Sequence, residues 1–187
     1  MKNIIGILLA AGNSIRFGGD KLSYPLPDGE SIGLTSGRKL INVLTDSVAV
    51  VRAGDVQLTE ELVQLGFRKV IQPNPAAGMG NSIARGIQAA QHADGWLIIL
   101  ADMPWIQTET LQHIAGALVN GAAIAAPVFQ GRRGHPVGFS QQFQEELAAL
   151  DGDSGAKKLL KTHAAMVQLL PVDDRGIVQD VDRRTDI

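Results

Sequence analysis

The chain has 187 residues, 45% of them hydrophobic, which suffices for one sizeable core, so we expect a single domain over residues 1–187. Lys and Arg number 17 and Asp and Glu number 19, a balance that argues against a nucleic-acid-binding surface or a polybasic membrane patch. The absence of cysteine excludes disulfides, thiolate metal sites and cysteine nucleophiles. The apolar run after Asn3 is too short to span a membrane and leads into a glycine loop, so we expect a cytoplasmic protein that binds neither membrane nor nucleic acid.

Short apolar runs rich in Ile, Val and Leu recur along the chain without strict alternation. Such runs are typical of strands buried on both faces of a mostly parallel sheet. A further run, His135 to Phe139, follows a turn-like segment and predicts an antiparallel member of the sheet. The strands predicted to be parallel are Ile4–Leu9, Ser47–Val51, Lys69–Ile71, Trp96–Leu100, Ala122–Ala126 and Met166–Leu170.

Helical periodicity appears between these runs, giving a βαβαβα alternation that predicts a doubly wound α/β fold. One helix is predicted around residues 111–118 behind a cap at Thr108, one around residues 83–90, and a short one after Thr59 that ends at Gly66. The stretch Tyr24 to Gly37, with two prolines and three glycines, predicts an irregular and mobile loop.

The loop after the first strand predicts a seat for a polyphosphate. Small residues at Ala10, Ala11 and Gly12 let backbone amides approach phosphate oxygens, and Arg16 and Lys21 supply positive charge. Its spacing matches neither the dinucleotide fingerprint nor the P-loop, since glycines fall at 12, 18 and 19 and Leu22 follows Lys21. The alternative is a glycine-rich turn with two solvated cations.

Two other loops follow predicted strands, where open α/β sheets bind ligands. Asp102 is the first charge after a buried run and is suited to holding Mg²⁺ against a triphosphate; alternatively, it caps a helix or a turn next to Pro104. The loop from Pro73 to Ser82 exposes amides suited to a ribose, a base edge or a phosphate. Its alternative is a rigid turn with Asn81 or Ser82 as a helix cap.

Two later segments carry weaker signals. His135, fixed before Pro136, either touches a substrate or packs at the end of a hairpin. Asp180 and Asp182 place two carboxylates on one side of an extended segment or on a turn, where one could join Asp102 as a second metal ligand; otherwise they are solvated.

Taken in chain order, these segments resemble the MobA-like nucleotidyltransferase family, which includes the molybdenum cofactor cytidylyltransferases and guanylyltransferases. The resemblance spans nearly the whole chain, and its Ala10-Ala11-Gly12 spelling is closer to the cytidylyltransferase branch. The matching pieces are Leu9-Ala10-Ala11-Gly12 through Arg16, Gly18 and Lys21; Asn74-Pro75; Gly78-Met79-Gly80 with Ser82; Asp102-Met103-Pro104; Gly134-His135-Pro136; Gly152-Asp153 with Gly155-Ala156; and Asp180-Val181-Asp182.

The resemblance implies a three-layer α/β/α, Rossmann-like fold of the nucleotide-diphospho-sugar transferase type, with one antiparallel strand. It implies Mg²⁺ held by Asp102 and Asp182, and a nucleoside triphosphate over the first loop. Two departures stand out: the family typically has Thr-Pro after the second aspartate, where this chain has Arg183-Arg184, and residues 31–40 differ from the common form. These departures leave open whether the acceptor is the molybdenum cofactor or a different molecule.

The sequence thus predicts an enzyme that transfers a nucleoside monophosphate, with CTP favoured as donor, to a phosphate-bearing acceptor resembling molybdopterin. Catalysis is expected from Arg16, Lys21 and Asp102, with acceptor contacts at His135 and Pro136 and a molybdoenzyme or its chaperone as protein partner. The expected nucleotide-binding residues are Leu9, Ala10, Ala11, Gly12, Ser14, Arg16, Lys21, Asn74, Gly78, Ser82 and Asp102. The alternatives are a guanylyltransferase or sugar-phosphate nucleotidyltransferase on the same fold, and a nucleotide-binding regulator or cofactor chaperone without turnover.

Overall fold

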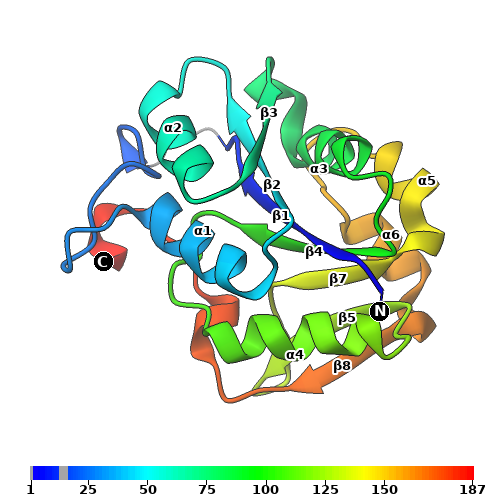
Figure 1. Ribbon diagram of the computed structural model, residues 1–187. Coiled ribbons are helices and arrows are strands. Elements are labelled where there is room, and N and C mark those ends of the chain that lie inside the picture. The colour runs from blue at the N-terminus through cyan, green and yellow to red at the C-terminus, as the bar shows by residue number, and fades with distance from the viewer. Residues whose placement is uncertain (1, 13–16) are drawn as a thin grey trace.

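An eight-stranded sheet forms the middle of the molecule in the computed structural model, which describes residues 2–12 and 17–187 (Figure 1). The strand order is β3-β2-β1-β4-β7-β5-β6, and β8 pairs with β5. The strands are β1 (Ile4–Ala10), β2 (Ser47–Arg52), β3 (Arg68–Gln72), β4 (Gly95–Leu100), β5 (Ile124–Phe129), β6 (Arg132–Arg133), β7 (Val137–Ser140) and β8 (Val167–Pro171).

Most neighbouring strands are parallel, and the antiparallel strand predicted near His135–Phe139 is confirmed as β7. It runs antiparallel to both β4 and β5, with Val137 opposite Ile98 and Phe139 opposite Ile124. The two-residue β6 also pairs antiparallel with β5. Strand β7 therefore lies between β4 and β5 in the sheet and runs against both of them. Because of this direction, the segment before β7 lies at the carboxyl ends of the parallel strands.

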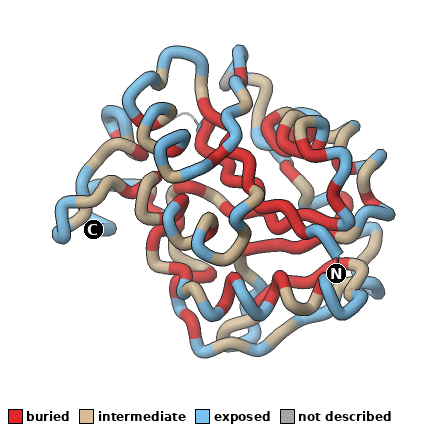
Figure 2. The backbone as a smooth tube through the Cα atoms, in the orientation of Figure 1, coloured by how far each residue is buried: buried red, intermediate tan, exposed pale blue. Residues whose placement is uncertain are grey.

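Helices cover both faces of the sheet and complete the three layers (Figure 1). Alternate residues of β1 belong to different apolar clusters: Ile4 and Leu8 pack with α1, α2 and α4, whereas Ile5 and Ile7 pack with α3, α5 and α6. Figure 2 shows the resulting band of buried residues through the central strands. The helices are α1 (Ile32–Val43), α2 (Val56–Gln64), α3 (Gly78–Ala89), α4 (Thr108–Val119), α5 (Gln144–Ala148) and α6 (Lys157–Thr162). None of the described helices is long and apolar enough to cross a bilayer.

The prediction of an irregular loop over residues 24–37 is wrong from residue 32 onward, because α1 begins at Ile32. Ser31 caps this helix by accepting a hydrogen bond from the amide of Leu34 at 3.4 Å. Its glycines serve close packing: a Cβ at Gly37 would lie 2.7 Å from a methyl carbon of Leu62. The composition that resembles a loop is therefore that of a helix packed closely on α2.

The starts of two helices also differ from those predicted from the sequence. Thr108 is the first residue of α4 and not its cap, because the capping position is Gln107. The carboxylate of Asp174 accepts a hydrogen bond from the Gln107 amide at 2.9 Å, so a distant residue replaces a local cap. Helix α2 begins at Val56, before Thr59.

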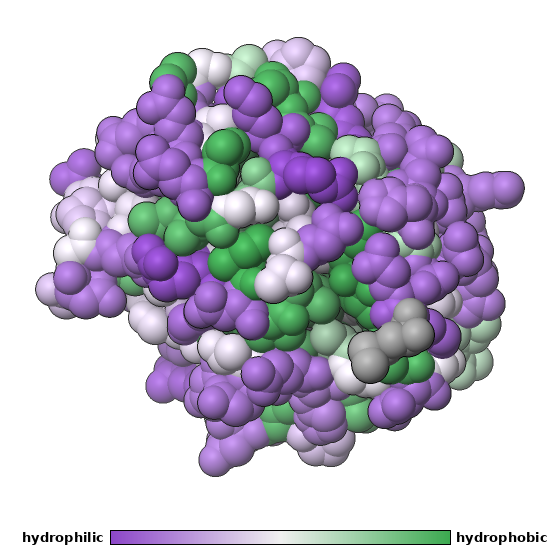
Figure 3. All heavy atoms as spheres, in the orientation of Figure 1, coloured by the Kyte–Doolittle hydropathy of each residue, from purple (hydrophilic) through white to green (hydrophobic). Residues whose placement is uncertain are grey.

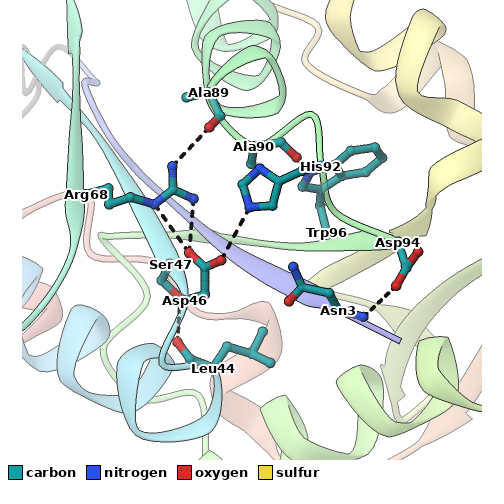
Figure 4. Close-up of polar contacts among 10 residues, drawn as sticks. All are labelled: Asn3, Leu44, Asp46, Ser47, Arg68, Ala89, Ala90, His92, Asp94 and Trp96. Carbon is teal, nitrogen blue, oxygen red and sulfur yellow. Dashed lines mark hydrogen bonds and ion pairs between the residues drawn. The ribbon is translucent and has the colours of Figure 1, made fainter. Parts of the chain in front are cut away.

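The amino ends of the parallel strands are tied together by polar contacts (Figure 4). Arg68 pairs with Asp46 at 3.0 Å and donates to the carbonyl of Ala89 at 3.0 Å, and His92 lies 3.6 Å from the same carboxylate. The amide of Asn3 donates to Asp94 at 2.7 Å. On the face in Figure 3, apolar side chains gather near the end of α1, where a cleft of about 370 Å³ lies between α1 and α4.

Candidate active site

The carboxyl ends of β1 and β4 lie side by side and position the first two predicted site segments. Leu9 is the register partner of Leu100, and the amide of Ala101 donates to the carbonyl of Leu9 at 3.0 Å. Ala10 and Ala11 are buried at this edge, whereas Gly12 is exposed. Asp102 therefore begins its loop next to the small residues of the first loop, as expected at the carboxyl edge of an α/β sheet.

Lys21 and Asp102 form an ion pair across this edge. The Lys21 Nζ lies 2.7 Å from Asp102 Oδ2, and the two side chains are only 12% and 24% exposed. The other carboxylate oxygen, Oδ1, is buried and has no hydrogen-bond partner among the described residues. An acceptor-only oxygen left in this state suits a cation, because a carboxylate can bind a second positive group.

The C-terminal segment contacts the backbone of the same residue, Asp102. The amide of Val181 donates to the backbone carbonyl of Asp102 at 2.9 Å, and the Val181 side chain is fully buried. The next residue, Asp182, is partly exposed, and its amide donates to Asp186 at 2.9 Å. The fold thus brings the two predicted metal ligands, 80 positions apart in the sequence, to neighbouring backbone positions.

Among the described residues, no group of three or more His, Cys, Asp or Glu side chains could hold a metal ion by itself. Magnesium typically binds proteins through one or two carboxylates, and substrate phosphates and water supply the remaining oxygen ligands. Asp102, with its unpartnered oxygen, and the adjacent Asp182 fit such a site. Ser14 and Arg16, two of the predicted phosphate-binding residues, lie outside the described residues.

The loop before α3 holds its polar side chains in local contacts. Asn74 Oδ1 accepts from the amide of Ala76 at 3.1 Å, and Ser82 Oγ accepts from the side-chain amide of Gln72 at 3.3 Å. Gln72, which is 1% exposed, also donates to Asn81 at 2.9 Å. Sequence reasoning missed Gln72, although an amide at the end of a short strand is a signal that could have identified it.

Close packing against a neighbouring loop requires a glycine at position 78. A Cβ at this position would overlap the backbone of Gly152, and the amide of Gly80 donates to the Gly152 carbonyl at 2.8 Å. The predicted loops around residues 74–82 and 152–156 are therefore packed together. Asn81 and Ser82 lie inside α3, which begins at Gly78, so neither is its cap.

His135 lies where the chain passes from β6 to β7. Its amide donates to the carbonyl of Ile177 at 2.9 Å, while a Cβ at Gly134 would overlap that same carbonyl. Continuing the antiparallel register from Val137 opposite Ile98 places His135 level with Leu100, two residues before Asp102. The peptide bond between His135 and Pro136 is cis.

The imidazole of His135 is held neutral at physiological pH. Burial lowers its pKa to about 4, the charge of Arg133 lowers the pKa as well, Asp180 raises it, and Lys157 lowers it. Its Nδ1 is buried, and no group in residues 2–12 and 17–187 forms a hydrogen bond with it. The ring therefore offers a neutral hydrogen-bonding group, flanked by charged side chains, at the same edge as Asp102.

Helix α1 supplies two contacts that sequence reasoning missed because it did not predict this helix. Ser36 Oγ donates to the carbonyl of Ala101 at 2.9 Å. Lys39 Nζ donates to the carbonyls of Pro104 and Ile106 at 2.6 and 3.0 Å. Desolvation by burial lowers the pKa of Lys39, against the opposing charges of Asp174 and Glu109. Both contacts hold the loop that begins with Asp102.

Comparisons with known proteins agree with this geometry. The chain is 30% identical over 190 residues to the purine catabolism protein PucB of Bacillus subtilis (strain 168), covering 96% of this chain and 91% of PucB. The crystal structure of Rv0371c from Mycobacterium tuberculosis H37Rv superposes with a TM-score of 0.85 at 26% identity, over 99% of this chain and 95% of that one. That protein has also been solved in complex with manganese, with a TM-score of 0.75 at 24% identity over 91% of this chain and 88% of that one.

A nucleotidyl transferase from Methanothermobacter shares the fold, with a TM-score of 0.82 at 17% identity over 98% of this chain and 93% of that one. The three-layer, nucleotide-diphospho-sugar transferase fold expected from the resemblance is therefore confirmed. Residues 6–167 match the model of the MobA-like NTP transferase domain. The chain belongs to the MobA-like NTP transferase family.

Proposed function

We propose that the chain transfers a nucleoside monophosphate, with CTP favoured as the donor, to a phosphate-bearing acceptor resembling molybdopterin, with release of pyrophosphate. The observation that carries this proposal is the carboxylate of Asp102 beside the small residues of the first loop. One of its oxygens pairs with Lys21, and the other has no partner in the part of the chain that the structure describes. This arrangement suits a triphosphate and a divalent cation that arrive together.

The first loop would hold the donor. Backbone amides around Ala11 and Gly12 and the residues up to Ser14 would bind phosphate oxygens, with Leu9 and Ala10 forming the floor. Arg16 and Lys21 would offset the charge of the triphosphate and of the leaving pyrophosphate. Asn74, in the loop before α3, and Gly78 and Ser82, at the start of this helix, would face the nucleoside. The choice of CTP rests on the Ala10-Ala11-Gly12 spelling of this loop.

Asp102 and Asp182 would hold Mg²⁺ at the α-phosphate, where the ion supplies charge neutralisation and orientation. The manganese complex of Rv0371c supports the use of a divalent cation. A phosphate acceptor needs no strong base, because its second pKa is about 6 and it is largely anionic at neutral pH. The neutral imidazole of His135 and the adjacent Pro136 would contact this acceptor, and a molybdoenzyme or its chaperone would receive the product.

The decisive experiment measures pyrophosphate release with each of the four nucleoside triphosphates and a panel of acceptors, including molybdopterin cofactor and sugar phosphates. We expect CTP with a molybdopterin-like acceptor to give the highest kcat/KM. GTP preference or sugar-phosphate turnover would replace the proposed specificity. Magnesium-dependent triphosphate binding without pyrophosphate release from any acceptor would favour a regulator or cofactor chaperone.

Variants test the assigned roles within the same assay. Asp102→Asn and Lys21→Ala are each expected to lower kcat by about 10²–10³, the usual loss when one electrostatic stabiliser is removed. Asp173→Asn, which removes the charge of an exposed aspartate, is the matched control and should leave the rate unchanged. Near-normal turnover of a folded Asp102→Asn protein would show that this carboxylate does not hold the metal.

A further inference from the structure

The C-terminal end of the chain lies beside the loop that carries Lys21 (Figure 1). The guanidinium carbon of Arg184 lies 5.7 Å from the ring centroid of Phe17 and 5.2 Å from that of Tyr24. The two rings contact each other edge to face, with centroids 5.3 Å apart. Both distances from Arg184 fall within the range of a cation–π interaction, so one cation is attracted to two rings of the same loop.

The other end of this C-terminal segment is fixed next to Asp102. The amide of Val181 donates to the Asp102 carbonyl, and its side chain packs in one apolar cluster with Phe17 and Leu22. Beyond it, Asp186 Oδ2 accepts from the amides of residues 182 and 183 at 2.9 and 2.7 Å. Asp182 therefore lies between an anchor at Val181 and an anchor at Arg184.

We propose that Arg184 is a positioning residue, which fixes Asp182 and the Lys21 loop relative to each other by stacking on Phe17 and Tyr24. The consequence for catalysis rests on the proposed function; the stacking itself does not.

If Arg184 fixes the C-terminal segment on the Lys21 loop, its removal should reduce the order of both. A segment held in place before binding avoids the ordering cost that a mobile segment incurs when substrate and metal bind. Exposed cation–π contacts are individually weak, and two together correspond to about a 5-fold or larger change in an equilibrium. Arg184→Ala should therefore loosen residues 17–24 and 181–187 together, and Arg184→Lys, which keeps a cation, should restore part of the order.

Hydrogen exchange of the full-length protein without ligand tests the positioning role directly. In Arg184→Ala, amide exchange should accelerate about 5-fold in peptides from both segments, with the remainder of the chain unchanged. Arg183→Ala removes the same charge one residue away, without the ring contacts, and should leave both segments at the wild-type rate. Equal exchange in Arg184→Ala and Arg183→Ala would overturn the proposal, whether or not any nucleotide is transferred.

Kinetics then separate positioning from direct contact with the nucleotide. We expect Arg184→Ala to lower kcat about 5-fold, with KM for the nucleotide within about twofold and a melting temperature lower by no more than about 2–4 °C. Tyr24→Leu leaves the contact between Arg184 and Phe17, so it should lower kcat by less. The double variant should be no worse than Arg184→Ala alone, since Arg184→Ala already removes the contact with Tyr24. Additive losses, or an effect confined to KM, would assign Arg184 to ligand binding and refute the positioning role.

Discussion

Asp174 connects two segments that position the candidate site, so its replacement should destabilise the protein. It is 2% exposed and lies in the C-terminal segment, where its Oδ2 accepts from the amide of Gln107 at 2.9 Å and the hydroxyl of Thr110 at 2.7 Å. Its Oδ1 accepts from the amide of Gly176 at 2.9 Å. A single carboxylate therefore joins the start of α4 to the segment that continues to Asp182.

The expected cost of Asp174→Ala follows from these three donors. The Thr110 hydroxyl and the Gly176 amide lose their partner in buried surroundings, and the Gln107 amide loses its partner at a partly exposed helix start. Each unsatisfied buried group costs about 1–3 kcal/mol, and part of this loss is recovered by relaxation. We expect Asp174→Ala to lower the free energy of unfolding by about 3–5 kcal/mol.

Asp174→Asn should have a stability between those of the wild type and the alanine variant, with a free energy of unfolding about 1–2 kcal/mol below that of the wild type. The reason is that the asparagine amide keeps one acceptor oxygen in a side chain of nearly the same shape. Urea unfolding measures both values, and thermal unfolding should give a midpoint lower by roughly 6–20 °C for the alanine variant in a chain of this size. Asp173→Ala is the matched control, because Asp173 is exposed and adjacent, and should change stability by less than about 0.5 kcal/mol. An Asp174→Ala protein within about 1 kcal/mol of wild type would refute the reasoning.

Two further predictions concern the segment before β7. Because the pKa of His135 is about 4 when folded and about 6.5 when unfolded, the unfolded chain binds more protons between these values, so stability should fall as pH drops from 6.5 towards 4. His135→Asn should remove about 3 kcal/mol of the difference in unfolding free energy between pH 7 and pH 4, and an unchanged difference would contradict the assigned cause. Gly134→Ala should lower unfolding free energy by more than about 2 kcal/mol because its Cβ would overlap the carbonyl of Ile177. Gly116→Ala in α4, where a Cβ meets nothing within 4 Å, should raise it by about 0.5–1 kcal/mol; equal effects of the two alanines would refute the packing argument.

The central strands were predictable because their burial leaves a direct mark on the sequence. Strand β1 is covered on both faces, so all seven of its residues are buried and the run is continuous in apolar or small residues. Burial on both faces is wrong for β3 and β8, whose residues are mostly exposed or partly buried. The antiparallel strand β7 was also predictable, since turn residues precede a short apolar run. These signals are local, and they predict strands and one antiparallel member but not the order of the strands in the sheet.

Helix α1 was not predictable by the same means, because its sequence is governed by what packs against it. Gly33 and Gly37 are poor helix formers in isolation, yet a Cβ at either would press against Leu58 or Leu62 of α2. Its functional contacts, from Ser36 and Lys39 to the loop at Asp102, were missed for the same reason. Tertiary packing determines that such a helix forms, whereas its local composition predicts a loop.

Among the candidate site residues, position at a strand end was predictable but partners were not. The sequence places Asp102 after a buried run, and the fold then supplies Lys21 from a segment 81 positions earlier. Asn74 and Ser82 have partners nearby in the sequence: Asn74 accepts from the amide of Ala76, and Ser82, in the first turns of α3, accepts from the side chain of Gln72. Whether Asn74 and Ser82 also contact a nucleotide stays a prediction.

The pairing of Lys21 with Asp102 has a consequence for how ligands would enter the site. Held at 2.7 Å, the two groups neutralise each other in a half-buried environment where either charge alone would be costly. Under the proposed function, a triphosphate would offer Lys21 new anionic partners, and its accompanying cation would offer Asp102 a new positive one. Binding both together would exchange this ion pair for two new ones, whereas the nucleotide alone would leave the Asp102 carboxylate without the cation. We therefore expect triphosphate to bind more tightly with its metal than without it.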